Sequence, residues 1–234
     1  MNEAANPVTR NDRGYGAPTA RRGGAFLERF LAILGVVAIM ISAVGLQAQG
    51  AAATSDPMAT VKNSVDQVLE VLRDHATPRA QRQRKVIDLV AGRFDFAAMA
   101  RSSLGYSWKQ LTPAQQEQFV PLFTSFMEDA YLDKLSGYSG QQVQFLGQAT
   151  HGDGYAEVRT AVAPTDEGRQ PIRINYEMKR AGDAWKVYDV TIDDISITAN
   201  YRNQFNRVIH QRGFAALVSA MRQKQAELRS SIGA

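Results

Sequence analysis

Few side chains in this sequence could carry metal chemistry or act as nucleophiles. The three histidines, His75, His151 and His210, lie far apart, and none has a second metal-binding side chain four residues further on. Zinc sites draw three or four such side chains together, and the chain has no cysteine to add to them. The sequence therefore predicts no metal site and excludes a cysteine nucleophile.

Serine and nucleotide chemistry find no better support. The segment Gly137-Tyr138-Ser139-Gly140 lacks the G-x-S-x-G spacing of a nucleophile elbow, so Ser139 is expected to be a turn residue. No glycine-rich loop follows a predicted strand and opens a helix, which is the arrangement that cradles a nucleotide phosphate. These patterns argue against a serine hydrolase and a nucleotide-binding protein.

Two acidic sites remain as candidates for acid–base chemistry. Asp193 and Asp194 are adjacent, and neighbouring strand residues point to opposite faces, so a turn or a helix cap is the favoured interpretation. Tyr188 beside Asp189 could polarise a carbonyl of an apolar small molecule, as some isomerases do. This enzyme hypothesis requires a β-bulge, because a regular strand would separate the two side chains.

The elements that must position these residues begin with helices. Asp56 and Pro57 are typical of a helix start, and a second helix is predicted from Thr77, as its cap, to Ala91. Asp95 heads a short helical piece that ends near Gly105. The segment Thr112-Pro113-Ala114-Gln115 has the pattern of a capping box, which predicts a long helix to about Leu135.

After residue 137 the apolar period changes from near four to two. Strands are predicted at 143–145, 155–162, 172–178 and 185–192, with a hairpin turn at 152–154. Two helices follow, at about 197–211 and 213–228. The order of helices, meander and helices predicts an α+β fold in which helices pack on one face of a four-stranded antiparallel sheet.

Large apolar residues on a helix and on the sheet face each other in this arrangement. They can close a solid core, which the residues alone favour, or they can border a cleft for a ligand. The strand 185–192 leaves its inward parity open, since either Val187 and Asp189 or Tyr188, Val190 and Ile192 could face the helices. The candidate lining residues are Phe119, Phe123, Met127, Tyr131, Ile174, Tyr176, Met178, Tyr188, Val190, Ile192, Tyr201 and Phe205.

The first 53 residues have the pattern of a secretory leader. Five arginines precede an uncharged run from Phe30 to Leu46, and small residues follow, so that cleavage after Ala48 or after Ala53 would suit a signal peptidase. An uncleaved membrane anchor is the alternative. Without this segment the chain has 22 basic against 20 acidic residues, and this balance argues against a nucleic-acid partner.

Three segments resemble one protein family in order and spacing. They are Leu111-Thr-Pro-Ala-Gln-Gln with Phe119 and Phe123, the strand from Trp185 to Val190, and Asn200 to Phe205 leading into Gly213 and Leu217. The mature chain, from about Pro57 to Leu228, is similar to the MlaC (toluene-tolerance, Ttg) family of periplasmic lipid-binding proteins that serve an ABC transporter.

The resemblance implies a fold and a function. The fold is a twisted sheet like that of nuclear-transport-factor and cystatin-like proteins, and residues 54–234 would form one lipid-binding domain without enzymatic activity. An apolar pocket, lined by the twelve residues above, would hold a phospholipid as cargo, with no cofactor. The protein would shuttle through the periplasm between an inner-membrane ABC transporter complex and an outer-membrane lipoprotein complex, maintaining outer-membrane lipid asymmetry. A hopanoid cargo and a purely structural role in an envelope complex stay open.

Overall fold

The computed structural model describes residues 56–135, 141–163 and 170–232. The predicted leader, residues 1–53, and the turn predicted at Ser139 lie outside these ranges. Within them, no helix combines the length and the hydropathy that crossing a membrane would require.

The first two helices form a hairpin. Helix α2 (Pro57–Arg73) begins as predicted, because the Asp56 carboxylate accepts a hydrogen bond from Ala59 N at 3.0 Å. Helix α3 (Arg79–Ala91) begins later than predicted. Its N-cap is Pro78, and no side chain caps it, so the predicted cap at Thr77 is wrong. The Thr77 hydroxyl instead donates to Asp74 in the connecting turn.

The next helices begin at the predicted caps. Helix α4 (Phe96–Leu104) has Asp95 as its N-cap, and a 3₁₀ helix, η1 (Gly105–Gln110), follows. Helix α5 (Pro113–Leu135) starts with both hydrogen bonds of a capping box, Thr112 N to Gln115 Oε1 at 2.9 Å and Gln115 N to Thr112 Oγ1 at 3.3 Å. The capping box therefore fixes the start of the long helix.

The sheet is an antiparallel meander with one strand more than the sequence predicted. It contains β1 (Gln142–His151), β2 (Tyr155–Ala163), β3 (Ile172–Ala181), β4 (Ala184–Ile192) and β5 (Ile195–Ser196), in that spatial order. Strand β5 is two residues long and follows a tight turn at Asp193 and Asp194, which both have positive φ. The predicted turn at this acidic pair is confirmed, and the pair holds Arg173, whose guanidinium is 2.6 Å from Asp194.

A bulge in β4 decides which side chains face inward. Val187 pairs with Met178, whereas Asp189 pairs with Glu177, so Tyr188 is an extra residue in the strand. Trp185 and Val187 are buried before the bulge, and Val190 and Ile192 are buried after it. Neither regular parity predicted from the sequence is therefore correct along the whole strand.

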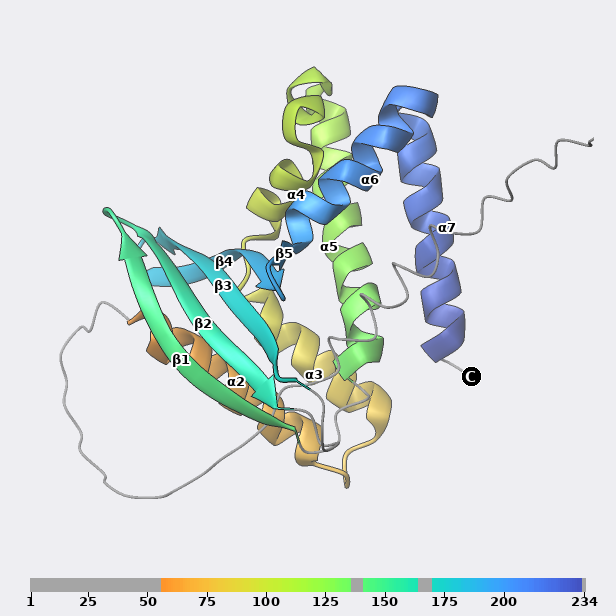
Figure 1. Ribbon diagram of the computed structural model, residues 1–234. Coiled ribbons are helices and arrows are strands. Elements are labelled where there is room, and N and C mark those ends of the chain that lie inside the picture. Colours follow the sequence, from red (N-terminus) through yellow and green to blue (C-terminus); the bar gives the residue numbers. More distant parts are fainter. Residues whose placement is uncertain (1–55, 136–140, 164–169, 233–234) are drawn as a thin grey trace, which may run out of the picture.

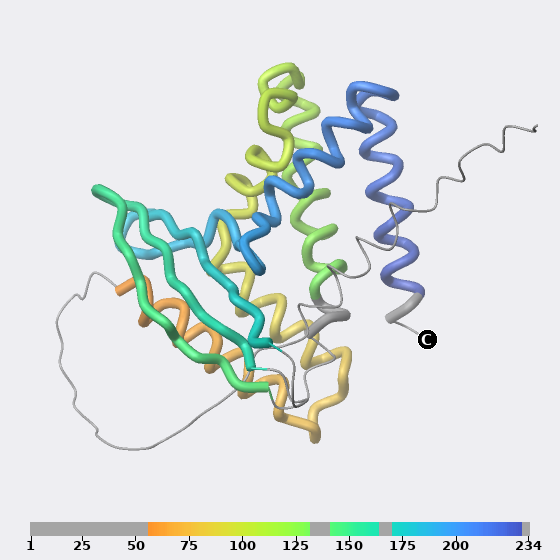
Figure 2. Tube along the Cα trace, viewed as in Figure 1, coloured from red at the N-terminus to blue at the C-terminus, as the bar shows by residue number. Residues whose placement is uncertain are grey.

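The remaining helices build a layer beside the sheet. Helix α6 (Ile197–Arg212) leaves β5 directly, and α7 (Phe214–Ile232) returns antiparallel to it. Figures 1 and 2 show α4, α5, α6 and α7 grouped together, with α2 lying against the sheet and α3 between the two groups. The α+β fold with helices packed on an antiparallel sheet is as predicted, and a continuous apolar core joins both parts.

Candidate functional site

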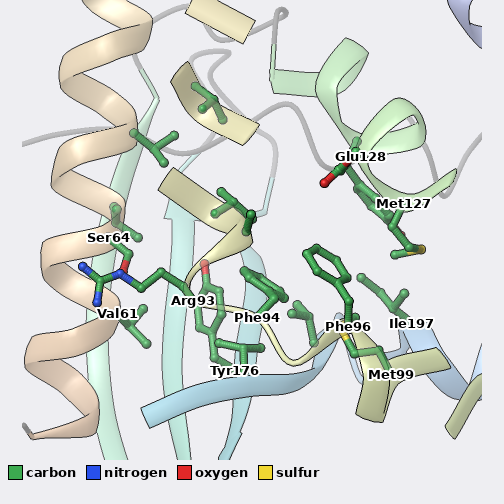
Figure 3. A pocket seen from close by; sticks show the side chains of 18 of the residues that line it. Val61, Ser64, Arg93, Phe94, Phe96, Met99, Met127, Glu128, Tyr176 and Ile197 are labelled. Carbon is green, nitrogen blue, oxygen red and sulfur yellow. The ribbon is translucent and has the colours of Figure 1, made fainter. Parts of the chain in front are cut away.

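An apolar cavity lies between the sheet, the α2–α3 hairpin and α5 (Figure 3). Its volume is about 210 Å³. About 10–15 Å³ suffices for one water by a comparable measure, so the cavity is far larger than an ordinary packing defect. The lining residues are Thr60, Val61, Ser64, Val65, Val68, Val86, Ile87, Val90, Ala91, Arg93, Phe94, Phe96, Met99, Met127, Glu128, Tyr131, Ile174, Tyr176, Met178, Val187, Val190 and Ile197.

Half of the twelve residues predicted to line a pocket border this cavity. Those on α5 are Met127 and Tyr131, and those on the strands are Ile174, Tyr176, Met178 and Val190. Ile174, Tyr176 and Met178 point to the helices, and polar residues alternate with them on the opposite face of β3. The β3 part of the sheet wall was thus predicted from its period of two.

Four of the other six belong to a solid aromatic core. The rings of Phe119 and Phe123 are 5.9 Å apart, and Phe205 stands perpendicular to Phe123 at 6.5 Å. Tyr201 packs edge-on against Phe123 at 6.4 Å. These rings fill the contact between α5 and α6 and do not line the cavity, and Ile192 is buried near them without lining it either. Aromatic size alone does not distinguish packing from a pocket wall.

Tyr188 lies on the opposite face of the sheet. Its ring contacts Tyr155 edge-on at 5.9 Å, and its hydroxyl is 3.5 Å from Glu177 Oε2. The predicted inward position of Tyr188 is therefore wrong, because the bulge adds this residue to the outer face. Burial and the neighbouring Glu177 raise the pKa of its hydroxyl.

Asp189 has a structural task that separates it from Tyr188. Its carboxylate accepts hydrogen bonds from Thr198 N at 3.1 Å and Thr198 Oγ1 at 2.9 Å, and from the Ser196 hydroxyl. These groups form the first turn of α6. The bulge that the enzyme hypothesis required is present, but it directs Tyr188 away from the cavity. The Asp189 carboxylate is used to order the start of α6.

The α2–α3 hairpin supplies a wall that the sequence interpretation missed. Val61, Val65 and Val68 of α2 and Val86 and Val90 of α3 all face the cavity. Their helical spacing predicts an apolar stripe that faces inward. The same spacing occurs whether the helix packs on a solid core or covers a cavity. The connection between α3 and α4 adds Phe94, and α4 adds Phe96 and Met99.

Two tyrosine hydroxyls provide polar groups deep in the structure. Burial raises the pKa of Tyr131 well above its ordinary value, and the neighbouring Tyr201 adds to this. Burial also raises the pKa of Tyr176 to about 12, partly opposed by a hydrogen bond with Thr160. Tyr131 and Tyr176 are both half-buried, and both line the cavity. Both hydroxyls stay protonated at neutral pH and cannot serve as bases.

The cavity wall carries two charged side chains, Arg93 and Glu128. Burial raises the pKa of Glu128. The nearby carboxylates of Asp129 and Asp88 raise it further, whereas Arg229 lowers it. Among the described residues, no group of three or more His, Asp or Glu side chains could hold a metal ion. The cavity can therefore enclose an apolar ligand, with one positive and one negative side chain at its wall.

A family model described as "MlaC protein" matches residues 62–223, which is more than half of the chain. The chain belongs to the MlaC family. The resemblance seen in the sequence is thereby confirmed. The MlaC protein of Haemophilus influenzae, named as the binding protein of an intermembrane phospholipid transport system, is 24% identical over 127 residues. That match covers 53% of this chain and 59% of the relative, so the chain spans less than two thirds of that curated protein.

One solved structure is similar over most of this MlaC-family chain. It is the phospholipid-binding protein from Ralstonia solanacearum in complex with a phospholipid, with 30% sequence identity and a TM-score of 0.66. The similarity covers 75% of the present chain and 99% of the Ralstonia chain. The fold found here is therefore that of a known phospholipid-binding protein.

Proposed function

We propose that this protein binds a phospholipid, with acyl chains inserted in the cavity between the sheet, the α2–α3 hairpin and α5. The observation that carries the proposal is the cavity itself, whose wall is apolar except for six side chains. Its support from outside the chain is the Ralstonia protein, which has the same fold and was solved with a phospholipid.

The proposed role is that of a carrier, without bond-making chemistry. Moving acyl chains from a bilayer into water costs about 0.8 kcal/mol for each methylene, so free phospholipids seldom leave a membrane. A protein that shields the chains removes most of that cost. Residues 54–234 would form the carrier domain, acting in the periplasm after the leader is cleaved.

The partners we propose are the two ends of such a route. One is an inner-membrane ABC transporter complex and the other an outer-membrane lipoprotein complex, each bound transiently. The name of the Haemophilus relative, which places that protein in an intermembrane phospholipid transport system, supports this assignment.

Transfer between vesicles tests the carrier role. Donor vesicles contain a phospholipid with a self-quenching fluorescent acyl chain, and acceptor vesicles contain none. The protein should accelerate the rise in fluorescence in proportion to its concentration, because each molecule carries cargo through water. A rate that does not change with protein concentration would reject the carrier.

A further inference from the structure

Arg93 is a cation in the wall of the cavity. Its side chain lines the cavity, and among the described residues no hydrogen-bond or ion-pair partner of its guanidinium occurs. Figure 3 shows the side chain extending toward Ser64 of α2. An arginine in a protein stays charged at every ordinary pH and presents five N–H donors, so a group with these properties is suited to an anionic ligand.

The backbone of Arg93 is held firmly at this position. Its carbonyl accepts a hydrogen bond from Val187 N at 2.9 Å, and Asp95 N donates to Val187 O at 2.8 Å. These bonds attach the connection between α3 and α4 to β4, next to the bulge. Arg93 thus projects from a fixed edge of the sheet, whereas its long side chain can adjust to a ligand.

The other charge on the cavity wall lies elsewhere. Glu128 comes from α5, and Figure 3 shows it on the side of the cavity away from Arg93. Asp88 of α3 and Asp129 add negative potential there, and Arg229, which could offset it, is paired with Asp129 at 2.9 Å. A phosphate would be repelled near Glu128 and attracted near Arg93.

From this asymmetry we infer that Arg93 binds the phosphate of the lipid and thereby fixes which end of the cavity receives the headgroup. The inference rests on the proposed function, since it assigns a residue to the phosphate of that cargo. Guanidinium and phosphate form short, charge-assisted hydrogen bonds, and the geometry permits two at once. Ser64 lines the same cavity.

Two lipids with identical acyl chains test the inference. Phosphatidylcholine carries the phosphate and diacylglycerol lacks it, and the affinity of each is measured by uptake from vesicles. Arg93→Gln should weaken phosphatidylcholine binding about tenfold or more and leave diacylglycerol binding unchanged. Arg93→Lys should recover part of the loss, because it restores the charge but not the paired donors.

Two further measurements test whether phosphate recognition belongs to Arg93 and to a lipid-borne phosphate. Arg222→Gln removes an exposed arginine of α7, outside the cavity, and should change neither affinity. Inorganic phosphate at low millimolar concentration should not displace phosphatidylcholine, since displacement would assign Arg93 to a free anion and overturn the inference.

The outcomes also distinguish the inference from the carrier role. Unchanged phosphatidylcholine binding in Arg93→Gln, or an equal loss for both lipids, overturns the assignment of Arg93 while the carrier stands. If the unaltered protein takes up neither lipid, the proposed function fails and the inference falls with it.

Discussion

Val187 and Val190 face the same cavity although three positions separate them in one strand. A regular strand would direct two such residues to opposite faces. The bulge at Tyr188 shifts the register by one, so that Val187 opposes Met178 and Val190 opposes Tyr176. One extra residue thereby joins the two halves of β4 into a single wall and places Tyr188 outside.

Filling the cavity from this wall should exclude the lipid. Val190 is 5% exposed and lines the cavity, so Val190→Trp places an indole in the space that we assign to acyl chains. Lipid recovered per mole of protein should fall severalfold, with the helical and strand content unchanged by circular dichroism. Tyr188→Trp, two residues away on the outer face, is the matched control and should retain full lipid. Equal recovery from both variants would mean that Val190 is not part of the lipid site.

The aromatic core should respond to truncation quite differently. Phe123 is fully buried against Phe119, Tyr201 and Phe205, so Phe123→Ala should lower the free energy of unfolding by about 3–5 kcal/mol in urea denaturation. Tyr106, which is 74% exposed, provides a control whose replacement by alanine should cost about 0.5 kcal/mol or less. Similar losses from the two substitutions would disprove the assignment of Phe123 to a packed core.

Replacing Asp189 should lower the stability of the fold. Asp189→Asn removes a charge that accepts hydrogen bonds from Ser196 and from both donors of Thr198, and about 1–3 kcal/mol of unfolding free energy should be lost. Asp194→Asn tests the solvent-exposed pair with Arg173, for which about 0–1 kcal/mol is expected. A larger loss from Asp194→Asn than from Asp189→Asn would reverse our interpretation of the turn.

Glu128 should make stability depend on pH in a defined direction. Burial raises its pKa in the folded protein, so the folded state binds more protons than the unfolded state between the two pKa values. Stability should therefore decline as pH rises from the unfolded value of about 4.3 through the higher folded value. Glu128→Gln cannot ionise and should avoid this decline, so its advantage over the unaltered protein should grow from pH 4 toward neutral pH.

The control for this pH effect is Glu227→Gln. Glu227 is exposed on α7 and pairs with Lys224 at 3.2 Å, so its replacement should not gain stability as pH rises. Parallel stability curves for Glu128→Gln and the unaltered protein would show that the carboxyl of Glu128 has an ordinary environment. The measurement is thermal or urea unfolding at a series of pH values and constant ionic strength.

Local signals in the sequence predicted most of the fold. The caps at Asp56, Asp95 and Thr112 gave helix starts because their hydrogen bonds involve residues only three positions away. Thr77 failed as a cap because the nearby Asp74 binds its hydroxyl. The bulge at Tyr188 was not predictable, since it depends on pairing with a strand elsewhere in the chain.

Only half of the residues predicted to line the site border the cavity, because long-range packing decides this as well. Alternation located Ile174, Tyr176 and Met178 on the inner face, where they line the cavity. Periodicity shows that a residue faces inward but not whether the space opposite is filled. Phe123 packs against other rings, whereas Val65 lines the cavity. Each belongs to an apolar stripe with helical spacing, so the spacing does not separate the two cases.

Extraction of the protein with its bound cargo shows whether the cavity holds a phospholipid. The mature protein is purified from bacterial periplasm without detergent, extracted with organic solvent, and the extract is analysed by mass spectrometry with an internal standard. We expect phospholipid in a roughly stoichiometric amount. A protein that is folded and yields no lipid would contradict it, and a hopanoid in place of phospholipid would assign the cavity to a different cargo.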